Sequence, residues 1–181
     1  PKDGRQMWLD KNDNVTKEFP SDAYVMTGKS SFAPWTGGFG ASARYKGISL
    51  SANFNFQAKK YMVNNDKYFY RNSDQGTSFN QCTDMLNVWT TPGQVTDIPR
   101  VGEELHLGDD TGWLENASFV RLKNLTVAYD FPKSLVNRWG LNGIQLHFTG
   151  RNLWTITDFS GYDPEPQSNM IQFQFPNTRQ Y

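Results

Sequence analysis

Two acidic side chains two positions apart, Asp163 and Glu165, have the residue types and close spacing seen in many glycosidase catalytic pairs. Such a pair can supply the acid and the base or nucleophile of glycoside hydrolysis. Pro164 fixes a turn between them, and carboxylates in turns are usually solvated rather than catalytic. No Ser/His/Asp arrangement or glycine-rich phosphate loop accompanies them. The sequence therefore predicts no catalytic residues and a protein that is not an enzyme.

Aromatic residues in polar segments are better candidates for ligand binding. A Trp or Tyr ring can stack on the apolar face of a sugar, while neighbouring Asn and Asp side chains bind its hydroxyl groups. The alternative is that these rings pack the loops on one another or on a partner protein. We predict substrate binding for six residues: Trp89, Trp113, Tyr68, Tyr70, Tyr162 and Asp163.

Neither a metal site nor a cofactor is predicted. His106 and His147 are far apart in the chain, and neither has a metal-ligand spacing. The segment Asp10–Asn14 resembles the start of a calcium loop, but Val15 and Ser21 stand where such a loop needs Gly and Glu. We expect a turn held by side-chain-to-backbone hydrogen bonds, with calcium binding as the less favoured alternative.

Composition narrows the class of protein. The 181 residues carry 18 basic and 18 acidic side chains, so no basic surface indicates nucleic acid as a partner. The single cysteine, Cys82, excludes an intramolecular disulfide and a cysteine metal site. Hydrophobic residues make up 37% and aromatic residues 15%. This balance suits strands with one apolar face, in a membrane barrel or in a soluble β-sandwich.

Alternating polarity predicts a β-hairpin from Gly38 to Lys59. Its turn is Lys46-Gly47, and its second arm alternates apolar and polar side chains without error from Ile48 to Gln57. The polar face carries small and amide side chains, which suit a water-filled lumen or a soluble surface, and the apolar face suits lipid. We predict five lipid-facing residues: Phe39, Ile48, Leu50, Phe54 and Phe56.

Further strands are expected in the second half of the chain. The third runs from Phe119 to Tyr129, and its apolar phase slips at Lys123-Asn124, which predicts a β-bulge. Phe131-Pro132 ends this strand because Pro cannot donate to the ladder. The remaining expected elements are a helical connector at 133–139 that stops at Gly140, a fourth strand from about 144 to 154 with His147 on its polar face, and a fifth strand that begins within 171–181.

The predicted connections alternate between short and long. Residues 61–115 have little regular pattern, and 155–170 form a second polar loop. A structureless stretch as long as the first is uncommon in a compact soluble domain. Outer-membrane barrels combine short periplasmic turns with long extracellular loops, and we expect both segments to be extracellular. No apolar run approaches the roughly 18 residues of a transmembrane helix, but barrel strands need only about 9–11 residues of alternating polarity.

Several blocks, taken in order, resemble the SusC/RagA-like branch of the TonB-dependent outer-membrane transporters over nearly the whole chain. The most specific are Ser118–Thr126 and Gly150–Leu153. The family's repeated strand opening is similar to Pro34–Phe39, Tyr45–Gly47 and Leu50–Phe54 of this chain. The family's extracellular segment is similar to Leu86–Trp89, Thr91–Gly93 and Thr96–Arg100.

This resemblance implies an all-β fold, a membrane-spanning antiparallel barrel of 22 strands. Residues 1–181 would be its C-terminal part, with about five strands and long extracellular loops. The resemblance further implies an N-terminal plug that is absent here, energy supplied through TonB, and a SusD-like surface lipoprotein as a lid. It implies import of oligosaccharides or peptides across the bacterial outer membrane, and it allows a dimer of transporter–lid pairs.

A soluble carbohydrate-binding β-sandwich is the alternative. The same five residues predicted to face lipid would then meet a second sheet, and the protein would fold unaided in buffer. The outward face of the strands is therefore the feature that separates the two hypotheses.

Overall fold

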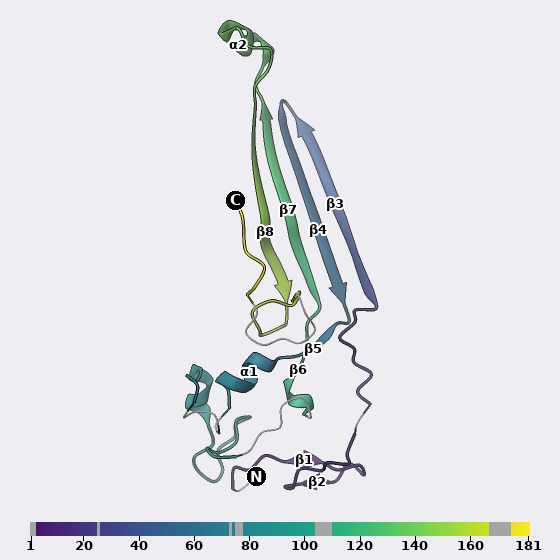
Figure 1. Ribbon diagram of the computed structural model, residues 1–181, viewed down its shortest axis with the longest axis vertical. Coiled ribbons are helices and arrows are strands. Elements are labelled where there is room, and N and C mark those ends of the chain that lie inside the picture. Colours follow the sequence, from purple (N-terminus) through teal and green to yellow (C-terminus); the bar gives the residue numbers. More distant parts are fainter. Residues whose placement is uncertain (1–2, 25, 73, 75–77, 104–109, 167–174) are drawn as a thin grey trace. The chain divides into compact units, whose positions relative to one another are not determined.

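The computed structural model describes residues 3–24, 26–72, 74, 78–103, 110–166 and 175–181 (Figure 1). The chain divides into two compact units. One comprises residues 30–62, 116–169 and 174–181 and contains the main sheet. The other comprises residues 1–29, 63–115 and 170–173. Each unit is described by itself.

The first unit is built on a four-stranded antiparallel sheet in the order β3-β4-β7-β8. Its strands are β3 (Trp35–Tyr45), β4 (Ile48–Ala58), β7 (Phe119–Asp130) and β8 (Gln145–Thr157), and they lie side by side in Figure 1. Each strand of the sheet pairs with the strand that precedes or follows it in this series, which is an up-and-down arrangement. The predicted hairpin and the third and fourth strands are confirmed, although the fourth runs three residues beyond its predicted end.

A two-residue turn at Lys46-Gly47 joins β3 to β4, as predicted. Both residues have positive φ, 47° and 86°, and Tyr45 pairs with Ile48 across the turn. This is the type I′ geometry, whose twist matches that of the flanking strands. A Cβ on Gly47 would lie 2.8 Å from the carbonyl oxygen of Asp130, so the position also lacks room for a side chain.

The predicted β-bulge in β7 is confirmed at Lys123. Asn124 pairs with Asn53 and Leu122 with Phe54, which leaves Lys123 as an extra residue relative to β4. On the other side of β7, two residues of β8, Asn152 and Leu153, lie opposite Lys123. Asn152 has a φ of 52°. Because the extra residue shifts the phase, the apolar side chains before and after the bulge share one face of the sheet.

A short helical connector follows β7. It consists of α2 (Lys133–Val136) and the 3₁₀ helix η3 (Asn137–Trp139), and α2 lies beyond the end of the sheet in Figure 1. Gly140, with a φ of 71°, ends it in the left-handed conformation that favours glycine. Val136, the last residue of α2, is fully buried. The predicted helical turn is thus confirmed.

The second unit consists of short elements and loops. They are β1 (Trp8–Leu9), β2 (Val15–Thr16), α1 (Asn65–Tyr70), and the 3₁₀ helices η1 (Thr83–Asn87) and η2 (Thr111–Trp113). The paired strands β5 (Tyr61–Val63) and β6 (Leu114–Asn116) stand where the chain passes from one unit to the other. The sequence pattern missed α1, which begins where the side chain of Asn64 accepts a hydrogen bond from the backbone nitrogen of Lys67.

The turn predicted at Asp10–Asn14 is confirmed. The Asp10 carboxylate accepts hydrogen bonds from the backbone nitrogens of Asn12, at 2.8 Å, and Asn14, at 2.9 Å. Within the described ranges, no helix has both the length and the apolar character needed to cross a membrane.

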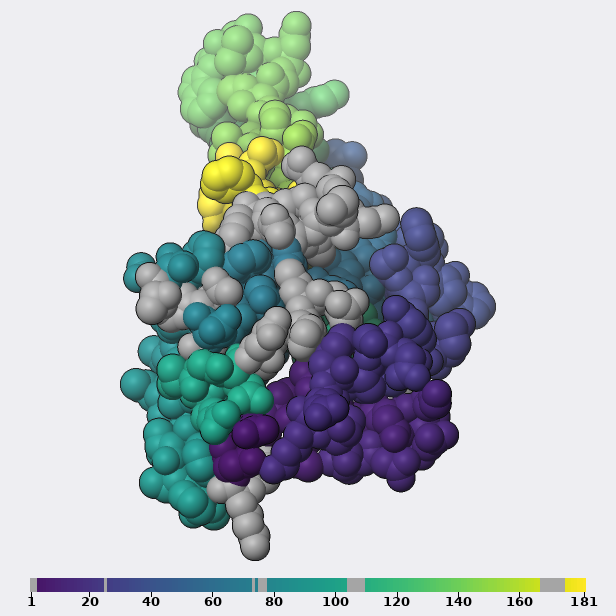
Figure 2. Space-filling view, turned by 60° about the horizontal axis from the view of Figure 1, so that its bottom comes forward, coloured from purple at the N-terminus to yellow at the C-terminus, as the bar shows by residue number. Residues whose placement is uncertain are grey.

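The fifth strand expected within 171–181 lies partly outside the described residues. Among 175–181, Gln180 forms an antiparallel bridge with Arg151 of β8, and Asn152 donates a hydrogen bond to the carbonyl oxygen of Thr178. These C-terminal residues, yellow in Figure 2, lie at the surface.

Candidate functional site

One face of the sheet is apolar and largely exposed. All five residues predicted to face lipid lie on it: Phe39, Ile48 and Leu50 are exposed, and Phe54 and Phe56 are half-buried. Phe39 and Phe54 stack across the hairpin with their ring centroids 4.9 Å apart. The same face carries exposed side chains of β7 and β8, namely Val127, Leu146, Phe148, Trp154 and Ile156. A patch of this extent marks an interaction surface rather than scattered surface residues.

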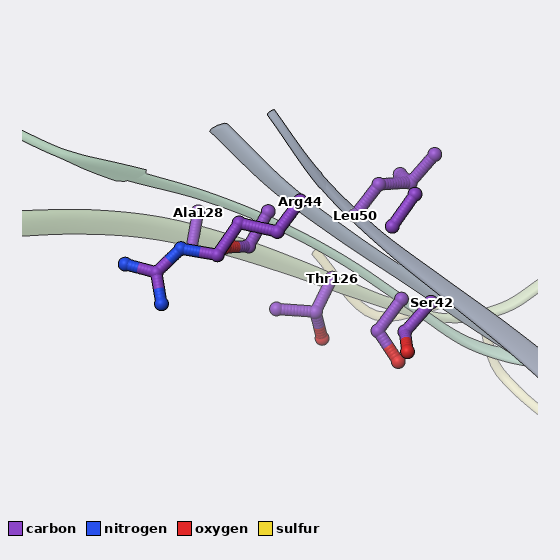
Figure 3. Close-up of a pocket in the computed structure, with 8 residues that line it drawn as sticks. Ser42, Arg44, Leu50, Thr126 and Ala128 are labelled. Atoms are coloured by element: carbon purple, nitrogen blue, oxygen red, sulfur yellow. The ribbon is translucent and has the colours of Figure 1, made fainter. Parts of the chain in front are cut away.

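The other face is polar and hollowed near the β3–β4 turn. A shallow hollow of about 260 Å³ is lined on this face by Ser42, Arg44, Ser49, Ser51, Thr126 and Ala128, and the intervening residues Ala43 and Leu50, whose side chains lie on the apolar face, also border it. Figure 3 shows the hydroxyl groups of Ser42 and Thr126 on one side of the strands and the side chain of Leu50 on the other. Small hydroxyl side chains leave this depression open to water.

A charged cluster attaches the loop after β8 to this polar face. Arg121, on β7, is only 2% exposed and forms an ion pair with Asp163. Its other terminal nitrogen lies 3.2 Å from a carboxylate oxygen of Glu165. Lys123, the bulge residue, forms an ion pair of 3.0 Å with Glu165. The loop therefore meets the sheet through two carboxylates and two cations.

Three further polar groups complete the attachment. Asn55 of β4 donates a hydrogen bond to Glu165 at 3.2 Å, and the Lys60 ammonium donates to the carbonyl oxygen of Pro164 at 2.8 Å. On the loop side, the backbone nitrogen of Asn177 donates to Asp163 at 2.8 Å. We name the set Lys60, Arg121, Lys123, Asp163 and Glu165 the loop clasp.

Burial and charge shift the pKa values within the loop clasp. Burial opposes ionisation of Asp163, but hydrogen bonds from the Arg121 guanidinium and from the backbone nitrogens of Glu165 and Asn177 hold the pKa of its carboxyl below the usual value. Burial lowers the pKa of the Lys60 ammonium, and the Glu165 and Asp163 carboxylates counteract that shift. The Asp163 carboxylate is therefore engaged by the Arg121 guanidinium and two backbone nitrogens. The geometry supports attachment of the loop rather than catalysis.

The structure brings some of the predicted binding residues together and separates others. Tyr162 and Asp163 are adjacent in the clasped loop, where Tyr162 is 66% exposed. In the other unit, Tyr68 contacts Trp113 edge to face with centroids 5.7 Å apart. Trp113 is buried in this arrangement, which leaves little of its ring for a ligand. Burial also raises the pKa of Tyr70.

Trp89 lies in a separate hollow of that unit. The hollow has a volume of about 180 Å³, and Trp89 is one of its lining residues together with Gly4, Arg5, Gln6, Met7, Thr96, Asp97, Ile98 and Pro99. A Cβ on Gly4 would lie 2.3 Å from the indole ring, so this glycine closely covers part of the ring. The closeness of Gly4 shows that Trp89 packs the loop segments together.

Sequence reasoning missed the cations of the loop clasp, Lys60, Arg121 and Lys123. The available signal was Arg121, a cation on the polar face of one strand, together with the acidic loop that follows the next strand. Of the two histidines, His147 is exposed on β8, and His106 lies outside the described residues. Within the described part of the chain, no group of three or more His, Cys, Asp or Glu side chains is arranged to hold a metal ion.

The curated proteins similar to this chain are of one class, the TonB-dependent receptors. No family model matches the chain. TonB-dependent receptor P3 of Formosa agariphila is 34% identical over 146 residues, which cover 80% of this chain and 14% of that protein. TonB-dependent receptor P26 of the same organism is 31% identical over 134 residues, or 71% of this chain and 13% of that protein.

Solved structures agree with these relatives. The RagAB peptide transporter matches 98% of this chain and 20% of its own chain, with a TM-score of 0.89 and 38% identity. The RagAB peptide importer in its open-open state gives a TM-score of 0.87, with 37% identity and the same coverage. The chain thus spans about a fifth or less of each of these proteins. Sequence and fold together identify it as a segment of a SusC/RagA-like TonB-dependent receptor.

Proposed function

We propose that this chain is part of the barrel wall and extracellular loops of a TonB-dependent importer in the bacterial outer membrane. The observation that carries the proposal is the sheet with one exposed apolar face and one polar face. The two shortest strands of this sheet, β3 and β4, have 11 residues each. At about 3.4 Å per residue and a tilt near 40°, such a strand covers about 28 Å, enough for the apolar band of an outer-membrane barrel.

The apolar face would then contact lipid through Phe39, Ile48, Leu50, Phe54 and Phe56, and the polar face would line the lumen. A soluble sandwich is not favoured, because it requires a second sheet over the apolar face. The other described strands are only two or three residues long. They are too short to form that layer.

The remaining parts of the proposal come from the family. Loops 61–115 and 155–170 would be extracellular, and the rest of the whole protein would supply the plug, the TonB contact and most of the wall. A SusD-like lipoprotein would cover the mouth. The imported substrate would be a peptide or an oligosaccharide, and peptides are the first class to test because the matched solved structures are of a peptide transporter.

Assembly of the whole transporter in the outer membrane tests the proposal. We expect Phe54→Arg to prevent formation of a heat-modifiable barrel, because a cation facing the middle of the bilayer costs roughly 2–4 kcal/mol. Asn53→Arg is the matched control: it places the same side chain at the adjacent position, on the polar face. The measurement compares unboiled and boiled outer-membrane samples by SDS gel electrophoresis.

Asn53→Arg should migrate like the unmodified protein, with a band that shifts on boiling. If both variants assemble, the apolar face does not meet lipid. If only Asn53→Arg fails, the two faces are assigned the wrong way round. A soluble unmodified protein with no heat shift would contradict the barrel itself.

A further inference from the structure

In the loop after β8, the residues on both sides of the exposed Tyr162 ring are buried or closely packed. Phe159 is buried, and a Cβ on Gly161 would lie 2.4 Å from that ring, so Gly161 packs closely on Phe159. Pro164 is buried as well. Tyr162, in contrast, is 66% exposed. Within 158–166, Tyr162 is the only large aromatic side chain that points into solvent.

The backbone that carries Tyr162 is fixed by the loop clasp. Asp163, the next residue, accepts hydrogen bonds from the Arg121 guanidinium and from the backbone nitrogens of Glu165 and Asn177, the last two at 2.8 Å each. Arg121 belongs to β7, so the attachment runs to the sheet itself. The position of Tyr162 is therefore set relative to the polar face of the wall.

Fixing a ring in advance removes part of the cost of binding. A ligand that meets a mobile loop must order the loop backbone as well as its side chain, whereas a ring on a fixed backbone has only its own two side-chain torsions to settle. Single exposed tyrosines are ordinary on protein surfaces. What distinguishes Tyr162 is that buried or ion-paired residues hold the positions around it.

We propose that the loop clasp presents Tyr162 as a fixed stacking surface for substrate that passes along the polar face of the wall. The partner chemistry is a ring with an apolar face, such as a proline or aromatic side chain of a peptide or the C–H face of a pyranose. Tyr162 contacts the ligand, and Asp163 and Arg121 are positioning residues. This inference rests on the proposed function, because it requires substrate in the lumen.

Binding to the purified whole transporter with its lid protein tests the inference. The ligands are proline-containing oligopeptides and, in a second arm, neutral oligosaccharides of similar length, measured by titration calorimetry. We expect Tyr162→Ala to weaken binding in one arm by about 2- to 10-fold and Tyr162→Phe to leave it nearly unchanged, because the ring supplies the contact. The arm that responds identifies the ligand class.

Tyr24→Ala is the matched control, because Tyr24 is an exposed tyrosine of the other unit and should not affect binding. Asp163→Asn should weaken binding in the same direction, and combining it with Tyr162→Ala should add little, since both act through one contact. Additive effects would show that the clasp does not position the ring.

Two outcomes separate this inference from the proposed function. If the unmodified transporter binds ligand and Tyr162→Ala binds equally well, the inference is wrong and the importer proposal stands. If the protein forms no heat-modifiable barrel and binds neither ligand class, both are wrong.

Discussion

At the scale of single residues, Arg121 is the side chain on which the attachment of the loop most depends. It is almost fully buried and pairs with two carboxylates, Asp163 and Glu165. Arg44 forms an ion pair of similar chemistry with Asp130, at 2.7 Å, but its side chain is largely exposed. Burial makes the difference, because water can replace a lost partner only where it has access.

We expect Arg121→Ala to release the loop, since it leaves the buried Asp163 carboxylate without its guanidinium partner at a cost of about 3–5 kcal/mol. Arg44→Ala should cost less than about 1 kcal/mol. Hydrogen exchange of residues 161–165 in the detergent-solubilised transporter measures the effect. Equal protection in both variants would mean that Phe159 and Pro164 hold the loop without the ion pairs.

At the scale of elements, the bulge at Lys123 accommodates one extra residue in β7 while both halves of the strand keep their apolar side chains on one face. Deleting Lys123 restores strict alternation along the strand. If residues 124–130 keep their register, Leu122 still pairs with Phe54 and Arg121 with Asn55, so Arg121 stays on the polar face.

We expect the Lys123 deletion to keep the heat-modifiable barrel, because the remaining residues of β7 alternate in register with β4. Lys123→Ala should also assemble, because it removes the ammonium group and keeps the extra residue. The same gel assay reports both results. A deletion variant that fails to assemble would show that the extra residue itself is needed to match β8.

Elements with local signals could be predicted from the sequence. The hairpin, its Lys46-Gly47 turn, the bulge at Lys123 and the stop at Gly140 each depend on side-chain alternation or on residues adjacent in the chain. Helix α1 was missed because its six residues have no clear periodicity of their own and begin at a single capping side chain, that of Asn64.

The candidate site was harder to predict than the fold. The sequence predicts Asp163 as a binding residue, yet its partner Arg121 lies 42 positions away, and no local pattern connects them. Burial of Trp113 against Tyr68 likewise depends on tertiary packing. Residue type identifies groups able to bind, but only the folded chain shows which of them are already engaged.

At the scale of the whole molecule, the chain spans about a fifth or less of the relatives it matches, so transport is a property to test in the complete transporter. We expect cells that carry the whole protein to take up labelled oligopeptide, and uptake to stop when the proton gradient of the inner membrane is collapsed. Entry of a small solute through general porins, which needs no such energy, is the control. Uptake that persists without the gradient would contradict TonB-driven import.

Burial of Arg121 also determines how the attachment of the loop responds to salt. Mobile ions weaken exposed ion pairs, since the screening length falls from about 10 Å at 0.1 M salt to about 3 Å at 1 M. Pairs such as Lys11–Asp22 therefore change with the medium. Arg121 is shielded from those ions by its burial. We therefore expect the Arg121–Asp163 attachment of the loop to respond less to ionic strength than the exposed pairs do.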